Sequence, residues 1–306
     1  MEQAVPGRTC IALVGPTASG KTELSLQLAE ETGAEIINMD AMQIFKGLDI
    51  GTAKPTLEEQ ARAPHHLFDI QEPDSPLGAG AYTELAKETI KALWEKGLPV
   101  ILVGGTGFYL RCLREGLSPV PEVAPEIRDA LQIRLSNEGL AILREELERV
   151  DPIWAEKIHP NDKQRTLRGL EVYNSTGSPL STFQKLPREG GLGSPINVAY
   201  LDPGQETLSH RIEKRAEIML EAGFVDEVRS LLERGLAKEA HGFRAPGYRE
   251  ILQHLDGTLD ADELIPAIIR SHKTYARRQR TFFKGESDRI EVQNLDDLMR
   301  LIAAKT

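Results

Sequence analysis

A glycine-rich run near the start of the chain constrains the fold more than any other feature. It reads Gly15-Pro16-Thr17-Ala18-Ser19-Gly20-Lys21-Thr22 and matches the pattern G-x-x-x-x-G-K-[ST]. A strand-like apolar run at residues 10–15 precedes it, and a helical pattern follows in which Leu24 and Leu28 share one face. Gly33 offers the left-handed stop of that helix. Strand, loop and helix in this order are the context that the motif requires, so we predict a phosphate-binding loop (P-loop, residues 15–22).

The P-loop predicts a bound di- or triphosphate. Its glycines let the backbone wrap an anion, and its N–H groups and the helix N-terminus point toward that anion. Lys21 adds charge, and the Thr22 hydroxyl can hold Mg²⁺. The competing interpretation is a chance match in a glycine-rich turn. By itself the motif does not name a reaction, and a kinase or ATPase is its commonest meaning.

Alternating strand and helix patterns predict the fold class. Short β-branched apolar runs at 10–15, 35–40, 99–105 and 197–202 indicate buried parallel strands, with a further candidate in RIEVQ (289–293). Helical patterns separate them. We therefore expect an α/β fold, a P-loop NTPase-like parallel sheet flanked by helices.

The middle of the chain departs from this alternation. Residues 118–195 contain no convincing strand but carry helical patterns at 125–135, 139–149, 151–158 and 162–176. Segments rich in Pro or Gly mark both edges, at 118–125 and 188–195. The sequence predicts an inserted all-helical subdomain at 118–195 within a discontinuous core formed by 1–117 and 196–306.

Composition limits the classes of partner. Lys and Arg number 37 against 47 Asp and Glu, a formal net charge of −10, so any RNA-binding surface must be a local basic patch. Cys10 and Cys112 are too few for a disulfide framework. The N-terminus lacks a signal-peptide pattern, and no apolar run is long enough to span a membrane. We expect a cytoplasmic protein with no membrane association, acting as a monomer.

Several ordered blocks resemble the bacterial-type tRNA dimethylallyltransferase family. After the P-loop come DAMQIFKG (40–47), LDIGTAKP (48–55), PHHLFDI (64–70), ILVGGTGFYL (101–110), DPIWAEKIHPNDKQRTLRGLEVY (151–173), HRIEKRAEIML (210–220), PGYRE (246–250) and YARRQRTFFK (275–284). They cover nearly the whole chain. The resemblance implies transfer of a dimethylallyl group from dimethylallyl diphosphate to the exocyclic amine of an adenosine next to the anticodon of tRNA. The related adenylate isopentenyltransferases lack the helical insert, so its presence favours tRNA as acceptor.

The resemblance and the chemistry together suggest catalytic residues. An adenine amine is a poor nucleophile and benefits from a base, for which Asp40 at the end of a predicted strand is the candidate. The alternative for Asp40 is a residue of the magnesium shell. Lys21 and Thr17 would stabilise the departing diphosphate, and Arg215 resembles the family arginine that reaches it. A solvated surface arginine is the other interpretation of Arg215.

The remaining candidates are for tRNA binding. The residues implied by the resemblance are Asp40, Ala41, Met42, Gln43, Thr106, Arg128, Gln164, Arg165, Thr166, Leu167, Arg168, Arg244, Gly247, Tyr248, Arg249, Arg277, Arg278, Gln279, Arg280 and Lys284. Thr106 is equally well placed as a helix N-cap. The chain departs from the family at Ala41, Phe45, Pro246 and Phe282, where Ser, Tyr, a β-branched residue and Trp are usual. Ala41 removes one hydroxyl near the target adenine.

A basic stripe supplies the local patch that the acidic composition demands. Its members recur every three or four residues, which places them on one face of a helix: Arg270, Lys273, Arg277, Arg280 and Lys284. The run from 270 to 284 contains no acidic residue. This favours a helix face that binds the anticodon stem-loop of tRNA over a charged face that is merely solvated. Two other functions stay open: a small-molecule or nucleotide kinase, and a non-catalytic RNA-binding module.

Overall fold

The computed structural model describes residues 10–303. The prediction that the N-terminus is not a signal peptide concerns mainly residues 1–9, which lie outside the described residues. The chain divides into two compact units, one running to Arg114 and resuming at Gly193, the other spanning Glu115–Leu192. The second unit corresponds to the predicted insert of 118–195, with each of its two boundaries lying three residues earlier in the sequence.

The first unit is built on a six-stranded sheet with strand order β3-β2-β4-β1-β5-β6. All neighbouring strands are parallel. The strands are β1 (Cys10–Val14), β2 (Glu35–Asn38), β3 (His65–His66), β4 (Val100–Gly104), β5 (Asn197–Tyr200) and β6 (Ile290–Glu291). The predicted P-loop NTPase-like α/β fold is thus confirmed. Strand β3 was not predicted, because two residues carry no periodic signal.

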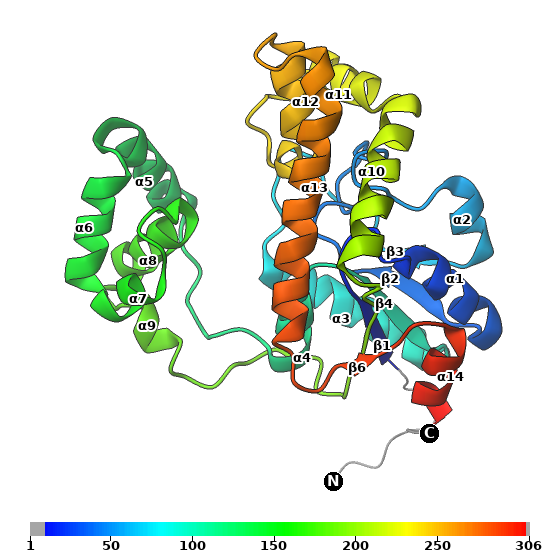
Figure 1. Ribbon diagram of the computed structural model, residues 1–306. Helices are drawn as coiled ribbons and strands as arrows, with labels where there is room; N and C mark the ends of the chain where they lie inside the picture. Colours follow the sequence, from blue (N-terminus) through cyan, green and yellow to red (C-terminus); the bar gives the residue numbers. More distant parts are fainter. Residues whose placement is uncertain (1–9, 304–306) are drawn as a thin grey trace. The chain divides into compact units, whose positions relative to one another are not determined.

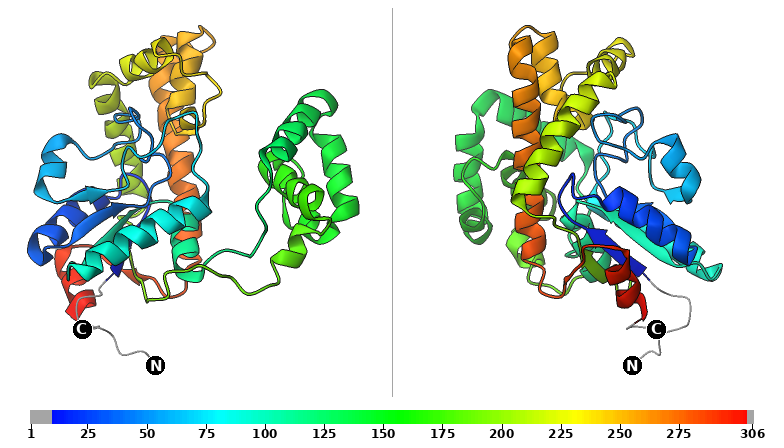
Figure 2. Two further views of the ribbon diagram at one scale, coloured as in Figure 1. Left: turned by 180° about the vertical axis from the view of Figure 1, so that it is seen from behind. Right: turned by 45° about the vertical axis from the view of Figure 1, so that its right-hand side comes forward.

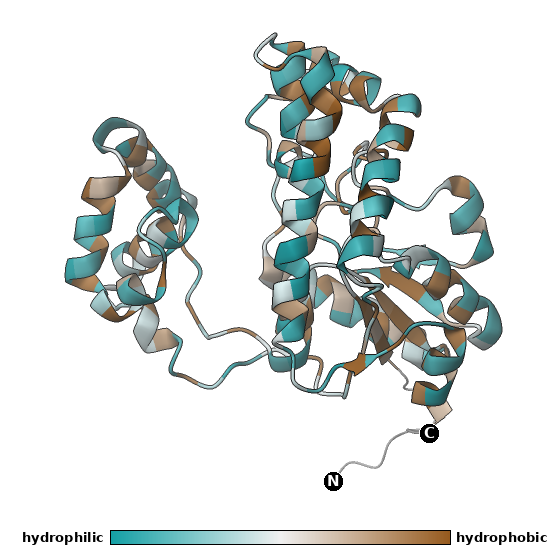
Figure 3. Ribbon diagram, viewed as in Figure 1, coloured by the Kyte–Doolittle hydropathy of each residue, from teal (hydrophilic) through white to brown (hydrophobic). Residues whose placement is uncertain are grey.

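Helices cover both faces of the sheet (Figures 1 and 2). Helices α1 (Lys21–Thr32) and α14 (Leu295–Ala303) pack together on one face, and α3 (Ala79–Glu95) lies on the other. The strands between them are strongly apolar (Figure 3), and every residue of β1 is buried. Burial on both faces explains why the strands have near-continuous apolar sequences rather than alternating ones.

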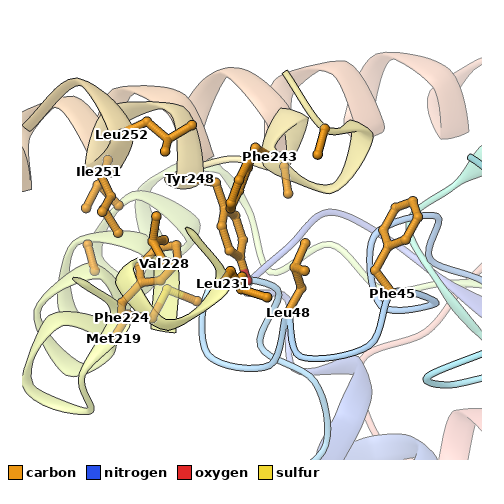
Figure 4. Packing of buried hydrophobic residues seen from close by; sticks show 14 of the residues in the cluster. Phe45, Leu48, Met219, Phe224, Val228, Leu231, Phe243, Tyr248, Ile251 and Leu252 are labelled. Carbon is orange, nitrogen blue, oxygen red and sulfur yellow. The ribbon is translucent and has the colours of Figure 1, made fainter. Parts of the chain in front are cut away.

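A second group of helices stands beyond the carboxyl ends of the strands. It contains α10 (Gln205–Glu221), α11 (Phe224–Glu233), the short η1 (His241–Arg244), α12 (Tyr248–Leu255) and α13 (Ala261–Lys284). Helices α10 and α13 run side by side (Figure 1). Their apolar cluster encloses Phe45 and Leu48 from the loop that follows β2 (Figure 4). This group therefore fixes the loop that carries Asp40. The remaining core helices are α2 (Leu57–Arg62) and α4 (Gly107–Glu115).

One carboxylate anchors that loop to the helical group. Glu227 of α11 accepts hydrogen bonds from the backbone N–H groups of Asp49 (2.9 Å), Ile50 (2.7 Å) and Gly51 (3.3 Å). It also accepts one from the Tyr248 hydroxyl at 2.6 Å. A side chain at Gly51 would lie 2.1 Å from the Phe224 ring, so only glycine fits against this anchor. These bonds give acceptors to the three N–H groups of a backbone turn, and residues of this turn line the cavity described below.

The second unit is entirely helical apart from one isolated β-bridge. Its helices are α5 (Pro125–Glu138), α6 (Leu140–Val150), α7 (Pro152–Lys157), α8 (Lys163–Thr176) and α9 (Leu180–Phe183). Buried leucines from α5, α6 and α8 form its core. The buried Asp151 carboxylate accepts from the N–H groups of Trp154 (3.0 Å) and Ser181 (2.9 Å), which ties the start of α7 to α9. None of the helices in the described part of the chain is long and apolar enough to cross a membrane.

We predict that Glu227→Ala lowers the free energy of unfolding by about 2 kcal/mol, because three backbone donors and a buried hydroxyl lose their acceptor. Chemical denaturation of both proteins measures this. Glu233→Ala, an exposed change on the same helix, serves as control and should stay within about 0.5 kcal/mol of the parent. Equal stability of the two variants would show that the anchor contributes nothing.

Candidate active site

The P-loop has the curled backbone that its glycines predict. Ala18 and Gly20 both have positive φ, at 63° and 102°. A side chain at Gly15 would lie 2.2 Å from the Leu201 carbonyl oxygen, so the loop can pass β5 only as glycine. The Lys21 ammonium donates to the carbonyl oxygens of Gly15 (3.0 Å) and Pro16 (2.7 Å). Its charge is thus held inside the loop, where an anion would bind.

Two arginines from α10 extend the positive charge over the P-loop. Arg215 donates to the Thr17 hydroxyl at 3.3 Å, and Arg211 donates to the Ser19 carbonyl oxygen at 2.9 Å. Burial lowers the pKa of the Arg215 guanidinium below its ordinary value. A cation that is costly to desolvate gains from an anionic partner, so this arrangement suits a diphosphate. The structure brings Thr17, Lys21 and Arg215 together as predicted.

Asp40 follows β2 and faces the same cavity. Its carboxylate accepts a hydrogen bond from the Met42 N–H at 2.9 Å. The Asn38 side-chain amide holds the Asp40 backbone: its oxygen accepts from the Asp40 N–H at 2.8 Å, and its nitrogen donates to the Asp40 carbonyl oxygen at 3.1 Å. Withdrawal from water raises the pKa of the Asp40 carboxyl, while the Met42 N–H and the Lys21 charge act against that rise. Burial lowers the pKa of Lys21 to about 7, with nearby Asp40 opposing the change. A carboxylate with a raised pKa is the better proton acceptor.

Thr106 lies between Asp40 and the start of α4. Its hydroxyl oxygen accepts a hydrogen bond from the Ala41 N–H at 2.9 Å. The Thr106 side chain therefore holds the residue beside Asp40. The Thr106 carbonyl oxygen accepts from the N–H groups of Tyr109 (3.0 Å) and Leu110 (3.4 Å), which places Thr106 at the N-cap position of α4 (Gly107–Glu115), one of the two roles weighed from the sequence. Gln43 is held as well, because its amide donates to the carbonyl oxygens of Thr52 and Ala53, both at 3.0 Å.

These groups surround one large cavity of about 1500 Å³. Its lining includes residues 17–22 of the P-loop, Asp40 and most of the segment 49–57, together with Arg211, Arg215 and Gln279. Apolar side chains line it beside the charged ones, among them Ile50, Leu57 and Ile218. A diphosphate and an apolar chain can therefore both be accommodated. Among the residues that the structure describes, no cluster of three or more His, Cys, Asp or Glu could hold a metal ion.

Four predicted tRNA contacts are corrected by their burial. Tyr248 is 0% exposed and its hydroxyl is committed to Glu227, while Gly247 is packed against Phe224. Thr166 and Leu167 face the interior of the helical unit. The sequence misled here because these residues share their motifs with exposed arginines, and successive residues of a helix point about 100° apart, so a buried residue can stand near an exposed one. Gln279 is only 5% exposed as well, but it lines the cavity and stays a candidate.

The remaining candidates differ in how freely they present their side chains. Arg280 forms a half-buried ion pair with Asp202 at 2.8 Å, Arg168 pairs with Glu171 at 3.2 Å, and Arg165 pairs with Asp162 at 2.9 Å. Arg270 and Lys273 of the basic stripe also have acidic partners. The exposed basic candidates without an ion pair among residues 10–303 are Arg128, Arg244, Arg249, Arg277, Arg278 and Lys284. Gln164 is exposed too, and Met42 is half-buried.

Two supporting residues were missed in the sequence. Asn38 is fully buried yet polar, and its amide positions Asp40. Lys54 is 2% exposed in its side chain, pairs with Asp49 and Asp69 at 2.5 Å each, and donates to the Phe45 carbonyl oxygen at 2.9 Å. A polar residue inside an apolar strand run was the available signal for Asn38. Nothing in the local sequence marks Lys54 as buried.

Comparison with known proteins agrees with the site. Residues 43–286 match the family model described as IPP transferase. The chain belongs to the IPP transferase family. It is 43% identical over 278 residues to "tRNA dimethylallyltransferase 1" of Trichlorobacter lovleyi, covering 90% of each protein. It is 42% identical to "tRNA dimethylallyltransferase" of Halorhodospira halophila, covering 92% of this chain and 91% of that protein. The family resemblance drawn from the motifs is thus confirmed.

Solved structures of this family have the same fold. The tRNA isopentenylpyrophosphate transferase of Bacillus halodurans superposes with a TM-score of 0.69 at 32% identity, covering 97% of this chain and 96% of that one. A eukaryotic dimethylallyltransferase described as acting on tRNA gives a TM-score of 0.78 at 27% identity, covering 96% of this chain and 78% of that one. The fold agreement extends over nearly the whole chain.

We predict that Arg215→Gln weakens binding of inorganic diphosphate roughly 10-fold or more, because one charge-assisted hydrogen bond to the anion is lost. Titration calorimetry measures the affinity. The matched control is Arg229→Gln, whose arginine is half-exposed, pairs with Asp226 on α11 and does not line the cavity. Unchanged affinity in Arg215→Gln would remove this residue from the anion site.

Proposed function

We propose that the protein transfers the dimethylallyl group of dimethylallyl diphosphate to the exocyclic amine of an adenosine next to the anticodon of tRNA, releasing diphosphate. The observation that carries the proposal is one cavity that holds both a cationic P-loop and a carboxylate with a raised pKa. The P-loop would bind the group that leaves. The names of the relatives reported above, which are tRNA dimethylallyltransferases or isopentenylpyrophosphate transferases, support this assignment.

The chemistry follows from those two ends of the cavity. The prenyl C–O bond breaks with both electrons going to the diphosphate, and the adenine nitrogen forms the new bond to the same carbon. Lys21, the Thr17 hydroxyl and Arg215 stabilise the charge that builds on the diphosphate oxygen. Asp40 accepts the proton that the nitrogen loses. Three of these groups therefore act on the leaving group and one on the nucleophile.

Mg²⁺ fits this scheme as a partner of the diphosphate. Thr22 lines the cavity in the first turn of α1, next to Lys21, and supplies a hydroxyl ligand. Since no acidic cluster is available among residues 10–303, substrate oxygens and water would fill the other positions, as Mg²⁺ prefers. When bound, the ion neutralises part of the diphosphate charge. We further propose that the protein works as a monomer in the cytoplasm.

Exposed side chains that have no acidic partner would contact the tRNA acceptor. Arg277, Arg278 and Lys284 lie near the C-terminal end of α13, and Arg128 with Gln164 lies on the helical insert. None of the five side chains has an acidic partner among the described residues, so they can meet phosphates without first breaking an ion pair. An anticodon-loop base is already unpaired and can be extruded at low cost.

The direct test is mass analysis of tRNA nucleosides after incubation with dimethylallyl diphosphate and Mg²⁺. We predict one adenosine heavier by a dimethylallyl group, and a turnover roughly 100-fold lower or more in Asp40→Asn with tRNA affinity retained. Asp74→Asn, an exposed carboxylate change, is the control and should leave turnover unchanged. Equal loss of turnover and affinity would make Asp40 a binding residue. Transfer of a phosphoryl group from ATP instead would reject the proposal.

We also predict that Arg277→Ala lowers tRNA affinity and reduces the slope of log affinity against log salt by about 1 or less, since one phosphate contact is lost. Filter binding over a salt series measures both. Arg300→Ala provides the control, because Arg300 is exposed on α14 and pairs with Asp297. An unchanged slope in Arg277→Ala would remove this end of α13 from the RNA face.

A further inference from the structure

Gln279 of α13 reaches the P-loop from the far end of the sequence. Its side chain is 5% exposed, and its carbonyl oxygen accepts a hydrogen bond from the Thr17 N–H at 2.8 Å. That N–H is therefore directed at protein rather than at the bound anion. Thr17 offers the diphosphate only its hydroxyl, the same group that Arg215 contacts. A buried glutamine thus fixes the orientation of a catalytic threonine.

The other end of the Gln279 amide packs against the loop after β4. A Cβ at Gly105 would lie 1.8 Å from the Gln279 nitrogen, and a Cβ at Gly104 would lie 2.1 Å from the Met39 carbonyl oxygen. Gly105 thus allows the Gln279 side chain of α13 to approach closely, and Gly104 allows the close approach of the Met39 backbone, which precedes Asp40. Both approaches would be blocked by any larger residue.

Thr106, the residue after Gly105, continues the connection. Its N–H donates to the Met39 carbonyl oxygen at 3.3 Å, and its hydroxyl oxygen accepts from the Ala41 N–H at 2.9 Å. A chain of contacts therefore runs from Thr17 through Gln279 and the Gly105-Thr106 segment to the residues on either side of Asp40.

We propose that Gln279 and Thr106 are positioning residues that set the distance between the leaving-group end and the base end of the site. The inference rests on the proposed function. Direct displacement at carbon requires the nucleophile and the leaving oxygen to be aligned, and an error of about 1 Å can cost roughly 100-fold in rate. The brace, defined as Gln279 and Thr106, links the two loops that carry those groups.

The test uses Gln279→Met, which keeps the length of the side chain but removes the acceptor for the Thr17 N–H, and Thr106→Val, which keeps the shape of the side chain but removes the acceptor for the Ala41 N–H. Both should lower the single-turnover rate at saturating substrates roughly 10-fold or more, with tRNA affinity within about twofold of the parent. Their effects on log rate should be non-additive in the double variant, because they belong to one network. Gln253→Met, an exposed change on α12, is the matched control.

Three results would overturn the inference. The first is weaker tRNA binding with a normal saturated rate, which would make Gln279 an RNA contact. The second is additive effects in the double variant, and the third is a lower melting temperature with a normal rate per active site. Should Gln279→Met fail to fold, Thr106→Val decides by the same measures.

Failure of the proposed function is distinguishable from failure of the brace. If the parent protein transfers no prenyl group, amide hydrogen exchange still reports on the contact: Thr17 should lose protection in Gln279→Met and keep it in Gln253→Met. Unchanged protection at Thr17 would overturn the brace even where the parent protein is active.

Discussion

Parallel strands that end at one edge of a sheet impose the constraint on which this structure depends. The P-loop follows β1, Asp40 follows β2, Thr106 follows β4 and Asp202 follows β5. Because all these strands run the same way, the residues after them meet at one place although they are up to 190 positions apart. Backbone packing alone thus assembles a site from segments that share no local sequence relationship.

The helices beyond that edge add further lining residues to the cavity, including most of its lysines and arginines. Arg211 and Arg215 come from α10 and Gln279 from α13, two helices that pack along each other. The protein is acidic overall, so these cations are a local concentration rather than a general property of the surface. Elsewhere the acidic residues engage much of the basic stripe, as Asp202 does with Arg280 and Glu213 with Lys273.

Sequence reasoning succeeded where a physical pattern is local. The P-loop was readable because strand, glycine curl and helix start lie within about twenty residues, and four strands were readable from their apolar runs. It failed where burial depends on tertiary packing. Tyr248 and Thr166 each stand beside an arginine that is exposed, and only the fold decides that one neighbour turns inward. The partners of Glu227 lie about 20 to 180 residues away, and no spacing rule predicts them.

The bond between Thr17 and Gln279 spans 262 residues, and this separation has a consequence for synthesis on the ribosome. The P-loop emerges early, whereas α13 follows only after most of the chain has been made. Until α13 has been made, the Thr17 N–H lacks this acceptor. Reactive geometry is withheld until nearly the whole polypeptide has been translated and α13 has docked.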